Sequence, residues 1–236
     1  MNSLSIIIPV ANEAAALPQC LARLESSPYE IIVVDAQSED DTRGIVERAG
    51  ARLFSHPQRH RARQMNHGAA EASGSILLFL HADTLLPPGA LAKIVRALDR
   101  PEAVGGAFTR RYLSPSLTLA LTTRLAALRN RLIGWHLGDQ AIFVRREVFE
   151  KLGGYRDMPI FEDLDFSRRL RSLGQTVTLT PPVLTSARRF AEKGPLRTTW
   201  DDLLLTRKYL SGKDPNALCL PSQNRIEPLQ SYERLS

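Results

Sequence analysis

Three acidic clusters in the sequence lie where a phosphate-bound cation or an abstracted proton could be held. Asp35 and Asp83 each follow a strand-like apolar run, and Glu162-Asp163 precedes an expected helix. In an open α/β sheet, ligands bind beyond the carboxyl ends of the strands. Carboxylates delivered to that edge are suited to holding a metal ion against a phosphate.

Each cluster also has a purely structural interpretation. Asp35 could be a turn residue followed by a capping box at 38–41, and Asp83 could cap the next helix. Glu162 and Asp163 could complement a helix dipole. Since the first two clusters close strands of one sheet, the three together favour a chemical site over three unrelated caps.

The elements that must position these acids alternate between strands and helices. We predict strands at 4–8, 30–34, 51–54 and 76–80, with helices at 13–26, 40–49 and 62–72 between them. This order predicts an α/β fold with a mostly parallel sheet. Farther along, strands are expected at 104–109, 141–145 and 175–179, and helices at 89–98, 116–133, 163–173 and 196–210.

Charge and aromatic content indicate which classes of partner the protein could bind. The 236 residues carry a net charge of +6 with a sequence pI near 9.7, which suits a phosphorylated substrate or an anionic membrane face. Aromatic residues make up only 6%, so a nucleic-acid partner is not expected. Cys20 and Cys219 lack metal-ligand spacing. Without a signal-like or membrane-spanning run, we expect a cytoplasmic protein with optional peripheral contact with the inner membrane face.

Five motifs, in order and spacing, resemble those of family 2 glycosyltransferases over residues 3–210. They are Ile6-Ile7-Ile8-Pro9-Val10-Ala11-Asn12-Glu13, Val33-Val34-Asp35 with Ser38 and Thr42, Asn66 with Gly74, Leu80-His81-Ala82-Asp83, and Glu162-Asp163. The stretch 61–66 and Gly138-Asp139-Gln140 look most like a bacterial subgroup labelled arsenosugar-biosynthesis-type glycosyltransferases. That label names a genomic association more than an activity.

The resemblance implies a GT-A-type nucleotide-diphospho-sugar transferase fold and inverting transfer from a nucleoside-diphosphate sugar, usually a UDP-sugar, to an acceptor hydroxyl. Asp163 would be the general base. The nucleotide-sugar would contact Pro9, Asn12, Glu13, Asp35, Arg61 (or Arg63), Asn66, Ala82 and Asp83. The acceptor side would include Gly138, Asp139, Gln140, Glu162 and Arg189, and Arg189 would also offset charge on the leaving diphosphate.

One position departs from the family pattern. The Asp-x-Asp metal motif reads His81-Ala82-Asp83 here, which removes one hard oxygen ligand of the kind that Mg²⁺ and Mn²⁺ prefer. We expect Asp83 to keep the contact with a divalent cation, Mn²⁺ or Mg²⁺. The identity of the metal and its affinity stay open.

The resemblance also implies a domain organisation. We expect one domain over 1–210, with 1–100 as the nucleotide-binding half and 101–210 as the acceptor half. Residues 211–236 would form an extended or partly disordered tail. The apolar segment 117–137 carries three arginines and could be an interfacial helix that approaches a lipid-linked acceptor. We favour a helix packed on the domain, because its apolar face would be needed to cover the sheet.

Two other functions fit parts of the sequence. A nucleotidyltransferase would open with a glycine-rich, basic loop after its first strand, whereas residues 9–13 contain neither glycine nor a basic residue. A non-catalytic nucleotide-sugar-binding protein fits the altered His81 but not the retained Asp163. The acceptor could be a sugar, a lipid-linked molecule or another small molecule, and the oligomeric state is open.

Overall fold

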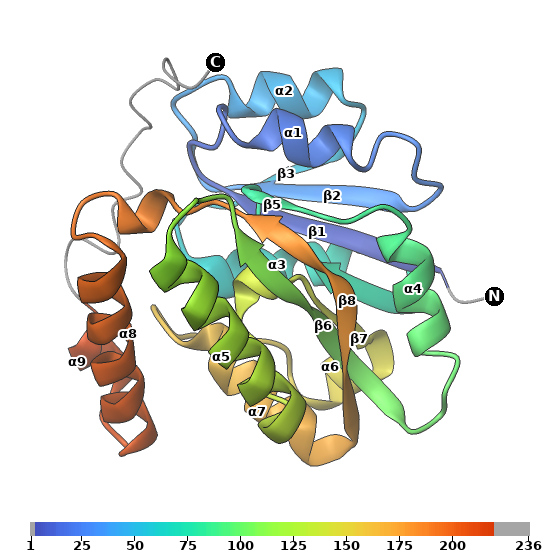
Figure 1. Ribbon diagram of the computed structural model, residues 1–236. Coiled ribbons are helices and arrows are strands. Elements are labelled where there is room, and N and C mark those ends of the chain that lie inside the picture. The colour runs from blue at the N-terminus through green and yellow to red at the C-terminus, as the bar shows by residue number, and fades with distance from the viewer. Residues whose placement is uncertain (1–2, 220–236) are drawn as a thin grey trace.

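The computed structural model describes residues 3–219, which build a mixed sheet of eight strands with helices on both faces (Figure 1). The strands, in the order β3-β2-β1-β4-β7-β6-β8-β5, are β1 (Leu4–Val10), β2 (Glu30–Asp35), β3 (Arg52–Ser55), β4 (Ile76–Phe79), β5 (Thr84–Leu85), β6 (Ala103–Tyr112), β7 (Ile142–Arg145) and β8 (Gln175–Thr185). The helices are α1 (Leu17–Ala22), α2 (Thr42–Arg48), α3 (Arg61–Glu71), α4 (Ala90–Ala97), α5 (Leu117–Ile133), α6 (Arg146–Lys151), α7 (Glu162–Leu173), α8 (Pro195–Leu210) and α9 (Pro215–Leu218), with 3-10 turns η1 (Gly138–Gln140) and η2 (Arg188–Phe190).

The first four strands are parallel, as the sequence predicts. β1 lies between β2 and β4, with Val10 opposite Asp35 and Ile7 opposite Phe79. Asp35 and the residues after Phe79 therefore emerge at the same edge of the sheet. This is the arrangement that brings the loops after β1, β2 and β4 together.

The second half of the sheet is mixed. β7 runs antiparallel to both β4 and β6, while β8 is parallel to β6 and antiparallel to β5. The predicted strand at 175–179 continues to Thr185, and β5 is too short to show a periodicity. These pairings place η1, between α5 and β7, near the end of β4.

Alternation along β1 divides the core into two layers. Ile6 and Ile8 pack with Leu17 of α1 and with the other side chains of one face, whereas Ile7 packs with Met65 of α3 and with an aromatic cluster on the other. Strands buried on both faces read as continuous apolar runs, and this is why β1, β2 and β4 are evident in the sequence.

Three local features differ from the sequence-based expectation. Helix α1 begins at Leu17 rather than at 13; residues 14–16 form a turn before it, and Asn12 adopts a left-handed φ of 56°. Pro9 lies inside β1 instead of ending it; the pairing of β1 with β4 reaches only Ile7, so the missing N–H of Pro9 disrupts no ladder there. Helix α9 occupies part of the expected tail, and residues 220–236 lie outside the described residues.

Helix α5 packs on the domain, but not through the face that we predicted. Leu119, Ala126 and Asn130 are buried against it. The leucine stripe instead faces outward, so the expectation that the apolar face covers the sheet is wrong. Between residues 3 and 219, every helix is too short or too polar to cross a bilayer.

Candidate functional site

Asp35 is a fully buried carboxylate at the end of β2. The Ser38 hydroxyl donates a hydrogen bond to one of its oxygens and the Ser38 N–H donates to the other at 3.3 Å. Arg43 lies 3.5 Å from the same carboxylate. The acid is therefore held as a fixed, compensated anion at the sheet edge.

The loops after β1 and β2 are tied to each other. The N–H of Asn12 donates to Ser38 Oγ at 2.8 Å, and its side-chain oxygen accepts from the N–H of Glu39 at 2.8 Å. The N–H of Glu13 donates to Thr42 Oγ1 at 2.9 Å. Hydrogen bonds of Asn12 and Ser38 thus hold the loops after β1 and β2 together at this edge of the sheet.

Arg188 of η2 joins two acids from different strands. Its guanidinium donates to both oxygens of Glu13, at 2.7 Å to Oε2, and lies 3.3 Å from Asp83 Oδ2. Burial raises the pKa of Asp83, Arg188 opposes that rise, and the nearby Glu13 adds to it. The pKa of Asp83 stays above its ordinary value, and Arg188 offsets only part of the cost of burying the charge.

Arg189, favoured from the sequence for the leaving diphosphate, has a different partner. Its guanidinium contacts Asp202 of α8, with the Oδ2 contact at 2.6 Å. The structure brings Arg188, not Arg189, to Asp83. Adjacent residues in a 3-10 turn point in different directions, so their positions in the sequence did not separate them.

Asp163 lies at the start of α7 and is oriented by two backbone amides. The N–H of Gly138 donates to Oδ2 at 2.7 Å, and the N–H of Leu164 donates to Oδ1 at 2.6 Å. A Cβ on residue 138 would lie 2.8 Å from His81 Nε2 and 3.3 Å from Asp163 Oδ2. A larger residue at 138 would displace the His81 ring, and at Gly138 the end of β4 and the start of α7 meet.

His81 is neutral in this setting. Burial lowers the pKa of its ring to about 3, and the positive charge of Arg61 adds to that effect. Its Nε2 is buried without a hydrogen-bond partner. A neutral, buried ring replaces the first acid of the metal motif.

Glu162 is 3% exposed and lies beside Asp163. Burial and the Asp163 charge raise its pKa to about 7, against the opposing effect of Arg61 at 3.4 Å. Burial alone would lower the pKa of Arg61, but Glu162, Asp163 and Asp83 raise it. Arg61 therefore lies within the acidic cluster, whereas Arg63 pairs with Asp157 at 2.6 Å.

Asp139 of η1 forms a two-oxygen contact with Arg110 of β6, each oxygen 2.5 Å from the guanidinium, and accepts from Tyr112 at 3.3 Å. Burial would raise the pKa of Asp139, but Arg110 lowers it below its ordinary value. Asp139 is consequently a half-buried, charged residue next to Gly138, whose N–H binds Asp163. Sequence reasoning missed both Arg110 and Arg188, because no spacing signal links them to the acids.

Three other candidates from the sequence have structural partners. Asn66 donates to the carbonyl of Tyr155 at 2.8 Å and accepts from its N–H at 2.9 Å. Gln140 bonds to the backbone of Leu137 and Phe108. Ala82 packs into the core. These side chains brace the loops around the site.

Strained backbone surrounds the same region. Within residues 3–219, the non-glycine residues with positive φ are Asn12 (56°), Gln37 (56°), Ala141 (53°) and Phe161 (65°). Each is within a few residues of a candidate site residue. Such conformations persist where the surrounding structure enforces them, and they cluster at functional sites.

The described part of the chain holds no group of three or more His, Cys, Asp or Glu side chains with metal-binding geometry. Asp83 alone presents a carboxylate from the altered motif. Mg²⁺ is commonly held by one or two carboxylates together with substrate phosphates, so one acid is compatible with a cation that arrives with its ligand.

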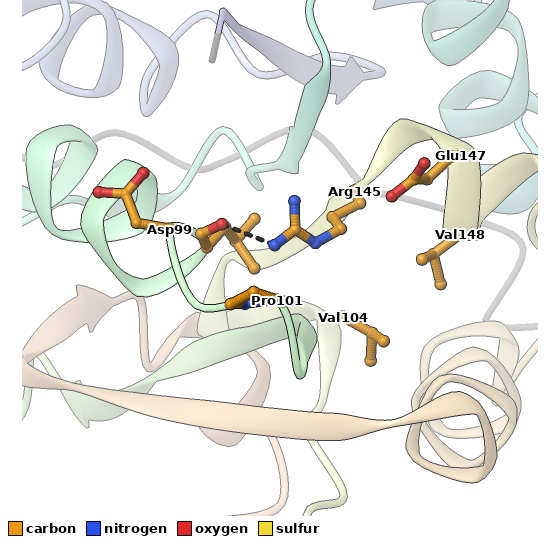
Figure 2. Close-up of a pocket in the computed structure, with 7 residues that line it drawn as sticks. Asp99, Pro101, Val104, Arg145, Glu147 and Val148 are labelled. Atoms are coloured by element: carbon orange, nitrogen blue, oxygen red, sulfur yellow. Dashed lines mark hydrogen bonds between the residues drawn. The ribbon is translucent and has the colours of Figure 1, made fainter. Parts of the chain in front are cut away.

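A hollow at the other edge of the sheet is unrelated to these acids. The hollow has a volume of about 440 Å³ and is lined by Arg145, Pro101 and Val148, among others. Figure 2 shows these side chains around it. The Arg145 guanidinium donates to the carbonyls of Leu98 and Ala103. Because Arg145 is opposite Ile76, the first residue of β4, this cavity lies away from Asp83.

Comparisons with known proteins agree with this architecture. The family model described as Glycosyl transferase family 2 matches residues 5–191. A PGL/p-HBAD biosynthesis glycosyltransferase of Mycobacterium bovis (strain BCG / Pasteur 1173P2) is 33% identical over 210 residues, covering 83% of this chain and 79% of that protein. An uncharacterized protein of Mycobacterium tuberculosis (MT1568, strain CDC 1551 / Oshkosh) is 31% identical, covering 80% of this chain and 67% of that protein.

Among solved structures, S. aureus TarS 1–349 in complex with UDP-GlcNAc superposes with a TM-score of 0.66 at 16% identity. The match covers 79% of this chain and 59% of that one, so the chain spans less than two thirds of that structure. This likeness shows the fold. The family model covers most of the chain, and the relatives at 31% and 33% identity agree with it. The chain therefore belongs to glycosyl transferase family 2 and is a glycosyltransferase.

Proposed function

We propose that the protein is an inverting transferase that moves a sugar from a nucleoside-diphosphate sugar, most simply a UDP-sugar, to an acceptor hydroxyl. The observation that carries the proposal is the contact at Gly138, where the end of β4 meets the start of α7. It brings the carboxylate of Asp163 next to the strand end that carries His81 and Asp83.

The donor half of the proposal rests on the edge formed by β1, β2 and β4. Asp35, buried and fixed by Ser38 and Arg43, presents an acceptor for the N–H of a base such as uracil. Arg188 lies between Glu13 and Asp83, where a diphosphate could replace one of the acids as its partner. The UDP-GlcNAc complex of S. aureus TarS, which shares the fold, supports a donor of this class.

The site offers a divalent cation one carboxylate ligand from the altered motif. Asp83 would hold it, as the one carboxylate of the altered motif, and Mn²⁺ and Mg²⁺ are the candidates that accept such an oxygen ligand. When bound, the cation would neutralise charge on the diphosphate. The protein itself also supplies positive charge next to Asp83, from Arg188 and Arg61.

Asp163 is the proposed general base. Two amide donors fix its orientation, and each carboxylate oxygen retains capacity to accept the acceptor's hydroxyl proton. A base acting opposite the leaving group gives inversion at the anomeric carbon. General-base catalysis of this kind contributes about 10²–10⁴-fold in rate.

The acceptor half is assigned to η1, Glu162 and the residues beside them. Asp139 is already paired with Arg110, so its role is to shape this side rather than to take a proton. Arg189 remains a proposed acceptor-side residue only through its position next to Arg188. The arsenosugar-type subgroup remains a prediction and contributes no substrate to the proposal.

The test is nucleotide release from a panel of nucleoside-diphosphate sugars, with Asp163→Asn compared with Asp157→Asn. Asp157 is an exposed acid that pairs with Arg63 and serves as the matched control. We expect Asp163→Asn to lose about 10²–10⁴-fold in turnover while calorimetry shows unchanged donor binding. Donor binding with no turnover in the unaltered protein would instead favour the non-catalytic binding protein.

A further inference from the structure

An apolar surface on α5 and α8 has no role in the proposed reaction. On α5, Leu117, Leu121, Leu125, Leu128 and Leu132 are between 54% and 86% exposed. Their spacing of three or four residues puts them on one face of the helix, opposite the buried Leu119, Ala126 and Asn130. We call the outward side chains of these two helices the α5–α8 surface.

Helix α8 lies against α5 (Figure 1) and carries apolar side chains that are also exposed. Its exposed apolar residues are Leu196, Trp200, Leu203, Leu204 and Leu210, with Trp200 60% exposed. They too recur at helical spacing. Single exposed apolar residues are common on protein surfaces and need no explanation. A contiguous group of large apolar side chains, in contrast, marks an interaction site.

The charged residues of α5 and α8 indicate which kind of partner binds this surface. Helix α5 contains Arg124, Arg129 and Arg131 and no acidic residue, and both Arg124 and Arg131 are exposed beside the leucines. Arg207 lies on the apolar side of α8 at the same helical spacing. A stripe of leucines bordered by arginines, with an exposed tryptophan, is the pattern of a helix that lies in the interface of an anionic bilayer.

A second copy of the chain is a poorer occupant. A twofold contact through α5 would bring the same basic helix of both copies together, and α5 offers no acid to pair with its arginines. The acids of α8, Asp201 and Asp202, already pair with Lys193 and Arg189 of their own chain. Anionic phospholipids satisfy the arginines and accept the leucines at once. The formal net charge of +6 acts in the same direction.

A groove beside α5 fits the same partner. It has a volume of about 770 Å³ and runs between the end of β6 and α5. Leu119 forms part of its buried wall, with Leu113 and Pro115 nearby, while Arg111 and Arg124 are its exposed cations. The lining also includes Thr109, Thr123 and Arg110, the last paired with Asp139. Its apolar part and the two exposed arginines suit an acyl chain beneath a phosphate.

We propose that the α5–α8 surface docks the protein peripherally on a membrane that contains anionic phospholipids. Docking requires no change in the fold, because the leucines already face outward. It does not depend on which sugar is transferred. The proposal assigns the outward leucines to the hydrocarbon boundary and Arg124 and Arg131 to the lipid phosphates.

Vesicle flotation tests the proposal with the full chain. We expect it to float with phosphatidylglycerol–phosphatidylcholine vesicles and to remain below with pure phosphatidylcholine. The double variant Leu128→Glu/Leu132→Glu should weaken binding at least tenfold, whereas Leu173→Glu, a matched exposed leucine on α7, should bind as the unaltered protein does. Replacing Arg124 and Arg131 with Gln should weaken binding about fivefold for each arginine.

Thermal unfolding of each variant shows that the fold is retained, since all substituted side chains are solvent-exposed. Failure of the unaltered chain to float with anionic vesicles would overturn the proposal. So would equal flotation of the Leu128→Glu/Leu132→Glu variant. A dimer in light scattering that this variant dissociates, without vesicle binding by the unaltered chain, would assign the surface to a second copy instead.

Discussion

Burial of Glu162 makes the free energy of unfolding depend on pH in a way that one substitution removes. The pKa of this side chain is about 7 in the folded protein and its ordinary value is 4.5. The protonated Glu162 therefore contributes to folded-state stability fully below about pH 4.5, and this contribution is lost as the pH rises through 7. The difference between the two pKa values corresponds to about 3 kcal/mol of free energy of unfolding. Solvent screens this effect little, because the side chain is only 4% exposed.

The substitution Glu162→Gln keeps the shape and removes the titration. Relative to the unaltered protein, we expect the variant to gain about 3 kcal/mol between pH 4.5 and pH 8.5, or roughly 6–12 °C in Tm. Urea unfolding at several pH values measures this change, and any pH-independent difference between the amide and the protonated acid cancels. The effect of Arg61 on the ionised carboxylate is already contained in the folded pKa. Because Asp163 interacts with Glu162, the titration belongs to the pair.

The matched control is Glu147→Gln, an exposed glutamate in the first turn of α6. Its stability should follow the unaltered protein at every pH. Parallel stability curves for the Glu162→Gln variant and the unaltered protein would refute the reasoning, because they would show that Glu162 ionises as readily when folded as when unfolded. A gain at acidic rather than alkaline pH would contradict the sign.

Three further predictions concern the charged groups around the site. Asp83→Ala should weaken donor binding and remove its dependence on Mn²⁺ or Mg²⁺; identical calorimetric titrations of the unaltered protein with and without metal would oppose a cation at this acid. Arg188→Gln should raise the donor Kd at least tenfold while Arg189→Gln changes it less, and the reverse order would return the role to Arg189. Arg110→Leu should lower the free energy of unfolding by about 1.5–3 kcal/mol at pH 7, since it leaves the half-buried, charged Asp139 without its guanidinium partner. The pKa of Asp139 is depressed by Arg110, so this loss should shrink as the pH falls below 3.8, and a pH-independent loss in urea unfolding would argue against it.

Local patterns were enough to predict most elements of the fold. The doubly buried strands β1, β2 and β4 are continuous apolar runs, and the intervening helices have the length of crossover connections. Parallel pairing then places Asp35 and Asp83 at one edge. Each of these inferences depends on residues close together in the chain.

Long-range packing decided which side chains meet at the edge. Glu13 and Arg188 are separated by 175 residues and Gly138 and Asp163 by 25, and no periodic signal in the sequence relates the members of either pair. Asn66 matched a family motif but braces Tyr155, a partner 89 residues away. This bracing contact is visible only in the tertiary structure, and the contact of Asn66 with a nucleotide-sugar stays a prediction.

Helix α5 shows the same division most clearly. Its sequence alone determined a helix with leucines at helical spacing, because that spacing is a property of the local chain. Whether the stripe faced the sheet or the solvent depended on which residues β6 and its neighbours could accommodate, and Leu119, Ala126 and Asn130 fill that space. Periodicity defines a face, and tertiary packing determines what that face contacts.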